Sequence, residues 1–315
     1  MKPPRAKDIM ITKLVTVPPG LDVLEAIRLL VKNNISGAPV VDEQSNYLGV
    51  FSEKCCMRLF DAIAQAAKQQ QVALPTLTDA RQLMSTKLVT LNPSADVVTA
   101  IGDLLKNHIS GVPVVDADKR FLGVFSEKTS MSVLIQAAYE QLPSTEVVAF
   151  MNTDFGRTIL EDVSFLDCAR LFRETPYRRL PVLRGGQLVG QVSRRDLLRN
   201  SIDLVSMVHD GAIALTAARR DVTRGDETSG EAAGRVQHFL DTEAQTIGED
   251  IDMLGIAQIF LNTPYRRLPV LRDGKLIGQI SRRDVLLTTH QMMEVPTQRE
   301  SSLLYLSALN TSFHQ

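Results

Sequence analysis

Two arginine-rich segments carry the side chains with the clearest capacity for chemistry in this 315-residue chain. Each segment, residues 177–196 and 265–284, contains five arginines and has a local net charge of +4. Guanidinium groups bind phosphate through paired hydrogen bonds, so tandem arginines favour a phosphate site. The whole chain has 35 basic and 36 acidic residues, which makes the doubled local excess informative. The arginines that open the segments are Arg178, Arg179, Arg266 and Arg267.

The two segments are copies within a fourfold repeat. Residues 175–184 return almost unchanged 88 positions later as residues 263–272. A fainter copy in the first half, residues 35–42, returns as residues 109–116. We number the repeats 1 to 4 in chain order; repeats 1 and 2 form one subtype, and repeats 3 and 4 form the other. In repeats 1 and 2, serine and glycine replace the tandem arginines, so the repeats share one fold and differ in chemistry.

The elements that position these residues can be predicted from repeat 1. Leu14–Val17 is short and β-branched, which predicts a strand, and a helix is expected after Asp22. Ala38–Val41 and Tyr47–Phe51 predict two further strands, and a second helical pattern begins at Glu53. The predicted order is strand, helix, strand, strand, helix, which makes the fold class α/β (α+β).

A unit this small leaves one sheet face and one edge open, and a second copy can cover both. We therefore expect adjacent copies of the same subtype to pair, repeat 1 with repeat 2 and repeat 3 with repeat 4. The two pairs could then stack into a four-lobed disc.

The repeated pattern resembles the CBS domain. A Pro-Val-Val or Pro-Val-Leu strand is followed by a turn and then by glycine, two hydrophobic residues and serine before a helix. Paired CBS domains form Bateman modules, and this chain resembles two such modules in tandem, a layout similar to that of the γ subunit of AMP-activated protein kinase. The resemblance implies a regulatory ligand with an adenosyl group: AMP, ADP or ATP, or alternatively S-adenosylmethionine or cyclic di-AMP. The arginines favour the phosphorylated ligands.

The resemblance also implies roles for individual residues. The family signature ends in an acid that accepts hydrogen bonds from ribose hydroxyls, and repeats 3 and 4 place Asp196 and Asp284 there. Repeats 1 and 2 carry Cys55 and Thr129 instead, which predicts a lost or altered pocket. The phosphate residues would be Arg178, Arg179, Ser193, Arg195, Arg266, Arg267, Ser281 and Arg283. The adenine rim and pocket walls would be Thr158, Pro181, Val192, Thr246, Pro269 and Ile280.

Simpler interpretations of these residues remain open. Asp196 and Asp284 could serve as helix caps and have no role in ligand binding, because serine with an acid three residues later is a helix-start signal. Any single arginine could be a solvated surface group.

Composition excludes several classes of protein. Three cysteines form no disulfide framework or zinc spacing, and no metal site or cofactor is expected. No apolar run approaches a membrane span and the N-terminus lacks a signal peptide, so we expect a cytoplasmic protein. The balanced overall charge argues against nucleic acid as a partner.

The predicted organisation has four repeats, one insertion and a tail. The insertion is polar and charged and is expected to be a flexible loop. The apolar stripe of the tail could pack back on the protein or act as a docking peptide. The boundaries are 1–74, 75–142 and 143–215 for repeats 1 to 3, 216–235 for the insertion, 236–290 for repeat 4 and 291–315 for the tail.

The leading hypothesis is a non-catalytic sensor of adenine nucleotides, with binding centred on repeats 3 and 4 and an unidentified protein or enzyme as the regulated partner. A protein-interaction scaffold with vestigial pockets is the main alternative, and a homodimer stays open. An enzyme is disfavoured because no nucleophile–base pair, metal-ligand spacing or Walker loop is found.

Overall fold

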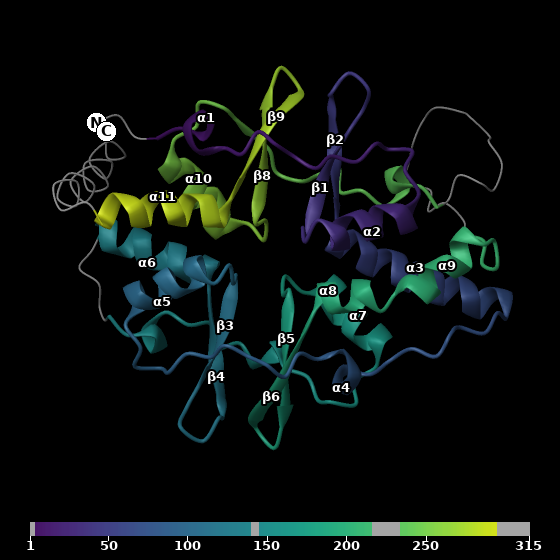
Figure 1. Cartoon of the computed structure of the whole chain (residues 1–315), viewed down its shortest axis with the longest axis horizontal. Helices are drawn as coiled ribbons and strands as arrows, with labels where there is room; N and C mark the ends of the chain where they lie inside the picture. Colours follow the sequence, from purple (N-terminus) through teal and green to yellow (C-terminus); the bar gives the residue numbers. More distant parts are fainter. Residues whose placement is uncertain (1–3, 140–144, 216–233, 295–315) are drawn as a thin grey trace.

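The computed structural model describes residues 4–139, 145–215 and 234–294. Four small α/β units surround a common centre when the molecule is viewed down its shortest axis (Figure 1). Each unit has a β-hairpin flanked by two helices, as the sequence predicts. Within the described residues, no helix is long and apolar enough to cross a membrane. Repeat 1 comprises α1 (Ala6–Ile9), α2 (Val23–Lys32), β1 (Gly37–Val41), β2 (Tyr47–Ser52) and α3 (Glu53–Gln70).

The other repeats follow the same order. Repeat 2 comprises α4 (Ala80–Leu83), α5 (Val97–Lys106), β3 (Gly111–Val115), β4 (Phe121–Ser126) and α6 (Glu127–Tyr139). Repeat 3 comprises the 3₁₀ turns η1 (Val147–Ala149) and η2 (Phe155–Arg157), then α7 (Phe165–Glu174), β5 (Arg179–Arg184), β6 (Gln187–Ser193), α8 (Arg194–Arg199) and α9 (Ile202–His209). Repeat 4 comprises η4 (Val236–His238), β7 (Ile247–Gly248), α10 (Met253–Asn262), β8 (Arg267–Arg272), β9 (Lys275–Ser281) and α11 (Arg282–Glu294).

The predicted first strand is the one element that repeat 1 does not form. Val17 makes a single parallel bridge to Val40, and the break at Pro18-Pro19-Gly20 follows at once. Proline has no N–H to continue a ladder, so the pairing ends after one bridge. In repeat 4 the corresponding segment extends to the two-residue strand β7, which pairs in parallel with β8.

A proline inside each first hairpin strand explains how the repeats join. Pro39 in β1 lies opposite Val50 in β2, and the N–H and C=O of Val50 instead bond to the backbone of Asp241 at 3.0 and 2.8 Å. Proline is tolerated there because that position of the hairpin makes no ladder hydrogen bond to its opposite residue. The outer edge of β2 is thus covered by the opening segment of repeat 4.

The same exchange of segments shows that the expected pairing of repeats is wrong. Backbone bridges join repeat 1 to repeat 4 and repeat 2 to repeat 3, and we find the two hairpins of each pair side by side in Figure 1. Repeats of one subtype lie diagonally opposite each other. The repeats pair in this way because each open strand edge forms backbone hydrogen bonds with the opening segment of a repeat of the other subtype. These edge bridges are Arg5–Asp252, Ile11–Gln279, Asn46–Lys275 and Val50–Asp241 for repeats 1 and 4, and Asp79–Ser164, Ser85–Gln191, Arg120–Gln187 and Val124–Asn152 for repeats 2 and 3.

Helices complete the ring by a second set of contacts. In repeats 1 and 3, α3 packs on α7, α8 and α9, and in repeats 2 and 4, α6 packs on α10 and α11. Each helix layer encloses one hydrophobic core. The rings of Phe60 and Phe165 meet across the first core with centroids 5.5 Å apart. Every repeat therefore touches two repeats of the other subtype, one through sheet edges and one through helices.

Two segments singled out in the sequence lie largely outside the described residues. The insertion is described only from residue 234, and the tail only to residue 294, where α11 ends.

Candidate functional site

A polar cavity of about 300 Å³ lies where the four repeats meet, and we call it the central chamber. Six arginines and two glutamates line it, which gives a formal net charge of +4. All eight residues predicted to contact phosphate are among its lining residues. The full lining is Asn34, Ser36, Glu53, His108, Ser110, Glu127, Arg178, Arg179, Ser193, Arg195, Arg266, Arg267, Ser281 and Arg283.

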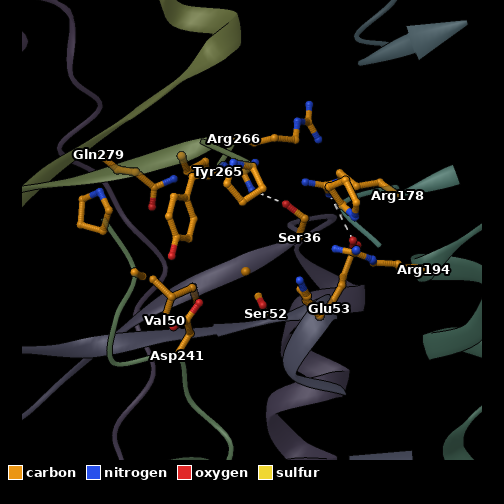
Figure 2. A pocket seen from close by; sticks show the side chains of 18 of the residues that line it. Ser36, Val50, Ser52, Glu53, Arg178, Arg194, Asp241, Tyr265, Arg266 and Gln279 are labelled. Carbon is orange, nitrogen blue, oxygen red and sulfur yellow. Dashed lines mark hydrogen bonds and ion pairs between the residues drawn. The ribbon is translucent and has the colours of Figure 1, made fainter. Parts of the chain in front are cut away.

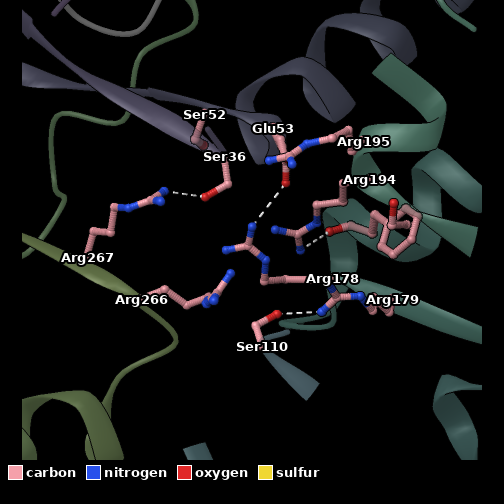
Figure 3. Close-up of polar contacts among 12 residues, drawn as sticks. Ser36, Ser52, Glu53, Ser110, Arg178, Arg179, Arg194, Arg195, Arg266 and Arg267 are labelled. Atoms are coloured by element: carbon pink, nitrogen blue, oxygen red, sulfur yellow. Dashed lines mark hydrogen bonds and ion pairs between the residues drawn. The ribbon is translucent and has the colours of Figure 1, made fainter. Parts of the chain in front are cut away.

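Two buried glutamates hold arginines at the chamber from opposite sides. Glu53, at the start of α3, pairs with Arg178 at 3.2 Å and with Arg195 at 3.2 Å, both from repeat 3 (Figure 3). Glu127, at the start of α6, pairs with Arg266 of repeat 4 at 2.5 Å. The two glutamate side chains are only 5 % and 6 % exposed. The first arginine of each tandem pair is therefore held by a repeat of the other subtype.

The second arginine of each tandem pair reaches across the sheet interface. Arg179 donates to the hydroxyl of Ser110, and Arg267 donates to the hydroxyl of Ser36 at 2.6 Å. Figure 3 shows the tandem arginines converging from the two sides of the chamber. The serines of the first half, which seemed to mark a loss of charge, instead orient the arginines of the second half.

The chamber is electrostatically unbalanced toward positive charge. Burial lowers the pKa of Arg178 well below its ordinary value, and the neighbouring charge of Arg266 lowers it further. Burial and then Arg266 likewise lower the pKa of Arg179 and Arg267. Like charges this close to one another disfavour their own protonated forms. A bound anion would relieve that repulsion.

Two clefts continue from the chamber. The 1/4 cleft has a volume of about 190 Å³ and lies between repeats 1 and 4 (Figure 2). It shares its inner residues with the chamber, and its outer end is formed by Val50, Asp241, Tyr265, Pro269 and Gln279. The residues shared with the chamber are Ser36, Glu53, Arg178, Arg266 and Arg267.

The 2/3 cleft is the counterpart between repeats 2 and 3, with a volume of about 250 Å³. Its outer end is formed by Val124, Asn152, Arg157, Tyr177 and Pro181. The guanidinium of Arg157 lies 4.7 Å from the centre of the Tyr177 ring. The 2/3 cleft shares five residues with the chamber: Ser110, Glu127, Arg178, Arg179 and Arg266.

Arg178 and Arg266 line the chamber and both clefts. The three spaces therefore meet at these two side chains. A helix start from the first half lines the inner end of each cleft: Glu53 of repeat 1 lines the 1/4 cleft, and Glu127 of repeat 2 lines the 2/3 cleft. The first half thus contributes directly to each cleft, and a site confined to a pair of repeats 3 and 4 is wrong because those repeats do not pair.

The two signature aspartates are held in helix caps. In repeat 3 the Oδ2 atom of Asp196 accepts from the N–H and hydroxyl of Ser193, at 2.8 and 2.6 Å. Asp284 accepts from Ser281 in the same way, at 2.7 Å in both bonds. Neither aspartate lines the chamber or the two clefts described above. The capping role left open by the sequence is present, and their ribose role stays a prediction.

The predicted wall residues divide into two groups. Pro181 and Pro269 line the 2/3 and 1/4 clefts. Val192 and Ile280 are fully buried in the cores, because they alternate inward along β6 and β9. Thr158 and Thr246 line none of the three spaces; the hydroxyl of Thr158 donates to the carbonyl of Phe155.

Sequence reasoning missed the acids and polar groups contributed across interfaces. Glu53 and Glu127 stand in the repeated Phe-Ser-Glu-Lys motif, so the motif itself was the available signal. Asp241 and Asn152 lie in the segments that cover strand edges, and no motif marks them. Their position follows only from the pairing of repeats.

Comparison with known protein families finds four copies of one domain. The CBS domain matches residues 6–61, 80–129, 140–203 and 236–289. The chain belongs to the CBS domain family.

Relatives of this CBS protein include both archaeal and human chains. An uncharacterized protein of Methanocaldococcus jannaschii, MJ1225, is 23% identical over 87% of this chain and 94% of its own length. Its crystal structure, described as that of a proposed archaeal homologue of the γ subunit of AMP-activated protein kinase, covers 90% of this chain and 99% of that one at 20% identity, with a TM-score of 0.37. The human γ-3 subunit of AMP-activated protein kinase is 25% identical over 59% of this chain and 39% of its own length.

Proposed function

We propose that this CBS protein is a non-catalytic regulatory subunit that binds adenine nucleotides, with their phosphates in the central chamber. The observation that carries the proposal is the convergence of all eight predicted phosphate residues on one cavity of net charge +4. The family supplies the ligand class, since a relative of this chain is named as a subunit of an AMP-activated kinase.

The chamber suits phosphate better than a neutral or cationic group. Its arginines come as planar donors that match phosphate oxygens bidentately. Burial, and then the neighbouring charge of Arg266, lowers the pKa of Arg178, Arg179 and Arg267, so an anion adds favourable interactions with several cations at once. S-Adenosylmethionine carries no phosphate to use these donors.

Transmission to a partner would follow from the ring of contacts. An anion at the chamber touches residues of all four repeats, so it favours one relative arrangement of them. A protein partner or enzyme that prefers this arrangement then responds to nucleotide concentration. The ligand must bind the two arrangements with different affinity, since equal affinities shift nothing.

Calorimetry and thermal unfolding test the proposal with AMP, ADP, ATP, S-adenosylmethionine and cyclic di-AMP. We expect at least one adenine phosphate to bind and to raise the unfolding temperature by several degrees at saturation. The variant Arg178→Ala with Arg266→Ala should weaken that binding about a hundredfold or more, at roughly 1.5–3 kcal/mol for each charged hydrogen bond lost.

The matched control is Arg184→Ala with Arg272→Ala. These arginines come from the same two repeats but pair with Glu161 and Glu249 away from the chamber. The control removes the same charge and should retain nucleotide binding. Equal losses in both variants, or no binding of any adenine phosphate to the parent protein, would refute the proposal.

A further inference from the structure

The outer ends of the two clefts are built alike but carry different side chains. Val50 exchanges backbone hydrogen bonds with Asp241 at 3.0 and 2.8 Å, and Val124 exchanges them with Asn152 at 2.9 Å in both directions. Asp241 and Asn152 therefore occupy equivalent places, each pinned to a strand edge by two bonds. One cleft has a carboxylate where the other has an amide.

The charge distribution fixes how a nucleotide would lie in either cleft. The inner ends share Arg178 and Arg266 with the chamber, so the phosphate end of a ligand belongs there. The outer end of the 1/4 cleft has apolar walls at Val50 and Pro269 and an aromatic ring at Tyr265. Figure 2 shows Arg178 and Asp241 at opposite ends of this cleft. A flat base suits the outer end.

At the outer end of the 1/4 cleft, the polar group of Asp241 can only accept. Its Oδ1 atom accepts one bond, from the N–H of Glu243 at 3.2 Å. Among the described residues, no other hydrogen bond to this carboxylate is found. An ionised carboxylate has about four acceptor positions. It therefore favours a ligand group that donates.

At the outer end of the 2/3 cleft, Asn152 and Arg157 supply groups that donate. The Oδ1 atom of Asn152 already accepts from the N–H of Asp154 at 3.2 Å and from Arg157 at 3.4 Å. The amide NH₂ of Asn152, which lines this cleft, can donate to a ligand. The Nε atom of Arg157 is buried without a partner among the described residues. Both groups favour a ligand that accepts.

We propose that the two clefts select purines with different groups at position 6, the 1/4 cleft a base with an exocyclic amino group and the 2/3 cleft a base with a carbonyl in that position. The inference rests on the proposed function for the location of the phosphates, and it adds the identity of the base in each cleft. A mismatch places acceptor against acceptor or donor against donor, and either leaves buried polar groups unpaired.

The experiment is calorimetric titration of the full chain with AMP and with IMP, singly and in sequence. The two nucleotides differ in the position-6 group, amino in AMP and carbonyl in IMP. We expect saturation with AMP to leave a site that IMP still fills, so their stoichiometries add. Asp241→Asn should weaken AMP binding at least tenfold and leave the high-affinity IMP site unchanged.

The reciprocal variant Asn152→Asp should weaken IMP binding at least tenfold and leave the AMP site unchanged. Glu243→Gln is the matched control, because Glu243 is an exposed acid two residues from Asp241 that lies outside the cleft lining. It removes one charge and should preserve both affinities. Circular dichroism of each variant verifies that a lost site is not a lost fold.

Two negative outcomes separate the inference from the proposed function. If AMP binds but IMP competes for the same sites with similar affinity, the base assignment is wrong and the nucleotide function stands. If neither nucleotide binds the parent protein, the base assignment falls, and the proposed function falls with it when ADP and ATP also fail to bind.

Discussion

Arg178 and Glu53, 125 positions apart in the chain, form an ion pair of 3.2 Å between repeats 3 and 1. Arg266 and Glu127 repeat the relationship between repeats 4 and 2. The pairs neutralise part of the chamber's positive charge, and each joins the two repeats of one helix layer at the chamber. Each glutamate therefore both stabilises the empty chamber and competes with an incoming anion for its arginine.

Removing both glutamate charges should therefore strengthen anion binding while weakening the fold. For Glu53→Gln with Glu127→Gln we expect nucleotide affinity to rise about thirtyfold or more, since at an effective dielectric of about 20 each of the two lost charges is worth on the order of 1 kcal/mol or more at such range. The free energy of unfolding without ligand should fall by about 3 kcal/mol for each of the two pairs, the lower end for breaking a buried pair, because the arginines are 24% exposed. Denaturant unfolding with and without nucleotide measures both, and an unchanged or reduced affinity would contradict the competition.

The sequence predicted the arginines that line the chamber, but it did not predict which repeats pair around it. Tandem arginines at one frame in repeats 3 and 4 predicted a phosphate site, because charge is carried by the residues themselves. The pairing could not be predicted, because it depends on which segment covers the open edge at Val50 and Val124. A single backbone bridge leaves no periodicity in the sequence. Asp241 and Asn152 enter the clefts only through that bridge.

Gly49 tests the exchange of segments between repeats 1 and 4. Its φ is 148°, and a Cβ there would lie 2.6 Å from the carbonyl oxygen of Asp241. Gly49→Ala should lower the free energy of unfolding by about 2–3 kcal/mol, because the covering segment must move. Gly20→Ala is the control, since no atom lies within 4 Å of its Cβ position. Equal stability of the two variants in urea would show that this contact contributes nothing.

Acid should destabilise repeats 3 and 4 through two equivalent carboxylates, Glu161 and Glu249, that are paired with arginines. Hydrogen bonds from Arg184 and Arg272 lower the pKa of Glu161 and Glu249 below the ordinary value of 4.5. Because their pKa is lower in the folded state, they stabilise the fold above about pH 4.5, and that contribution is lost as the pH falls through the folded pKa. Glu161→Gln with Glu249→Gln should flatten the dependence of stability on pH between about 3 and 5, measured by urea unfolding at each pH. A parallel profile in parent and variant would contradict the assignment.

Asp196 and Asp284 have a capping role in the structure and a ribose role predicted from the family signature, and one double variant separates the two. Asp196→Ala with Asp284→Ala removes the acid that accepts from Ser193 and Ser281, so unfolding free energy should fall by about 1 kcal/mol per helix start. The ribose prediction adds that nucleotide affinity falls beyond detection. Cys55→Ala with Thr129→Ala changes the same position in repeats 1 and 2 and should leave affinity intact, because neither residue is a full ribose acceptor. Calorimetry at matched folded fractions decides the matter: a double aspartate variant that is destabilised but binds AMP like the parent shows that these carboxylates serve the helices alone.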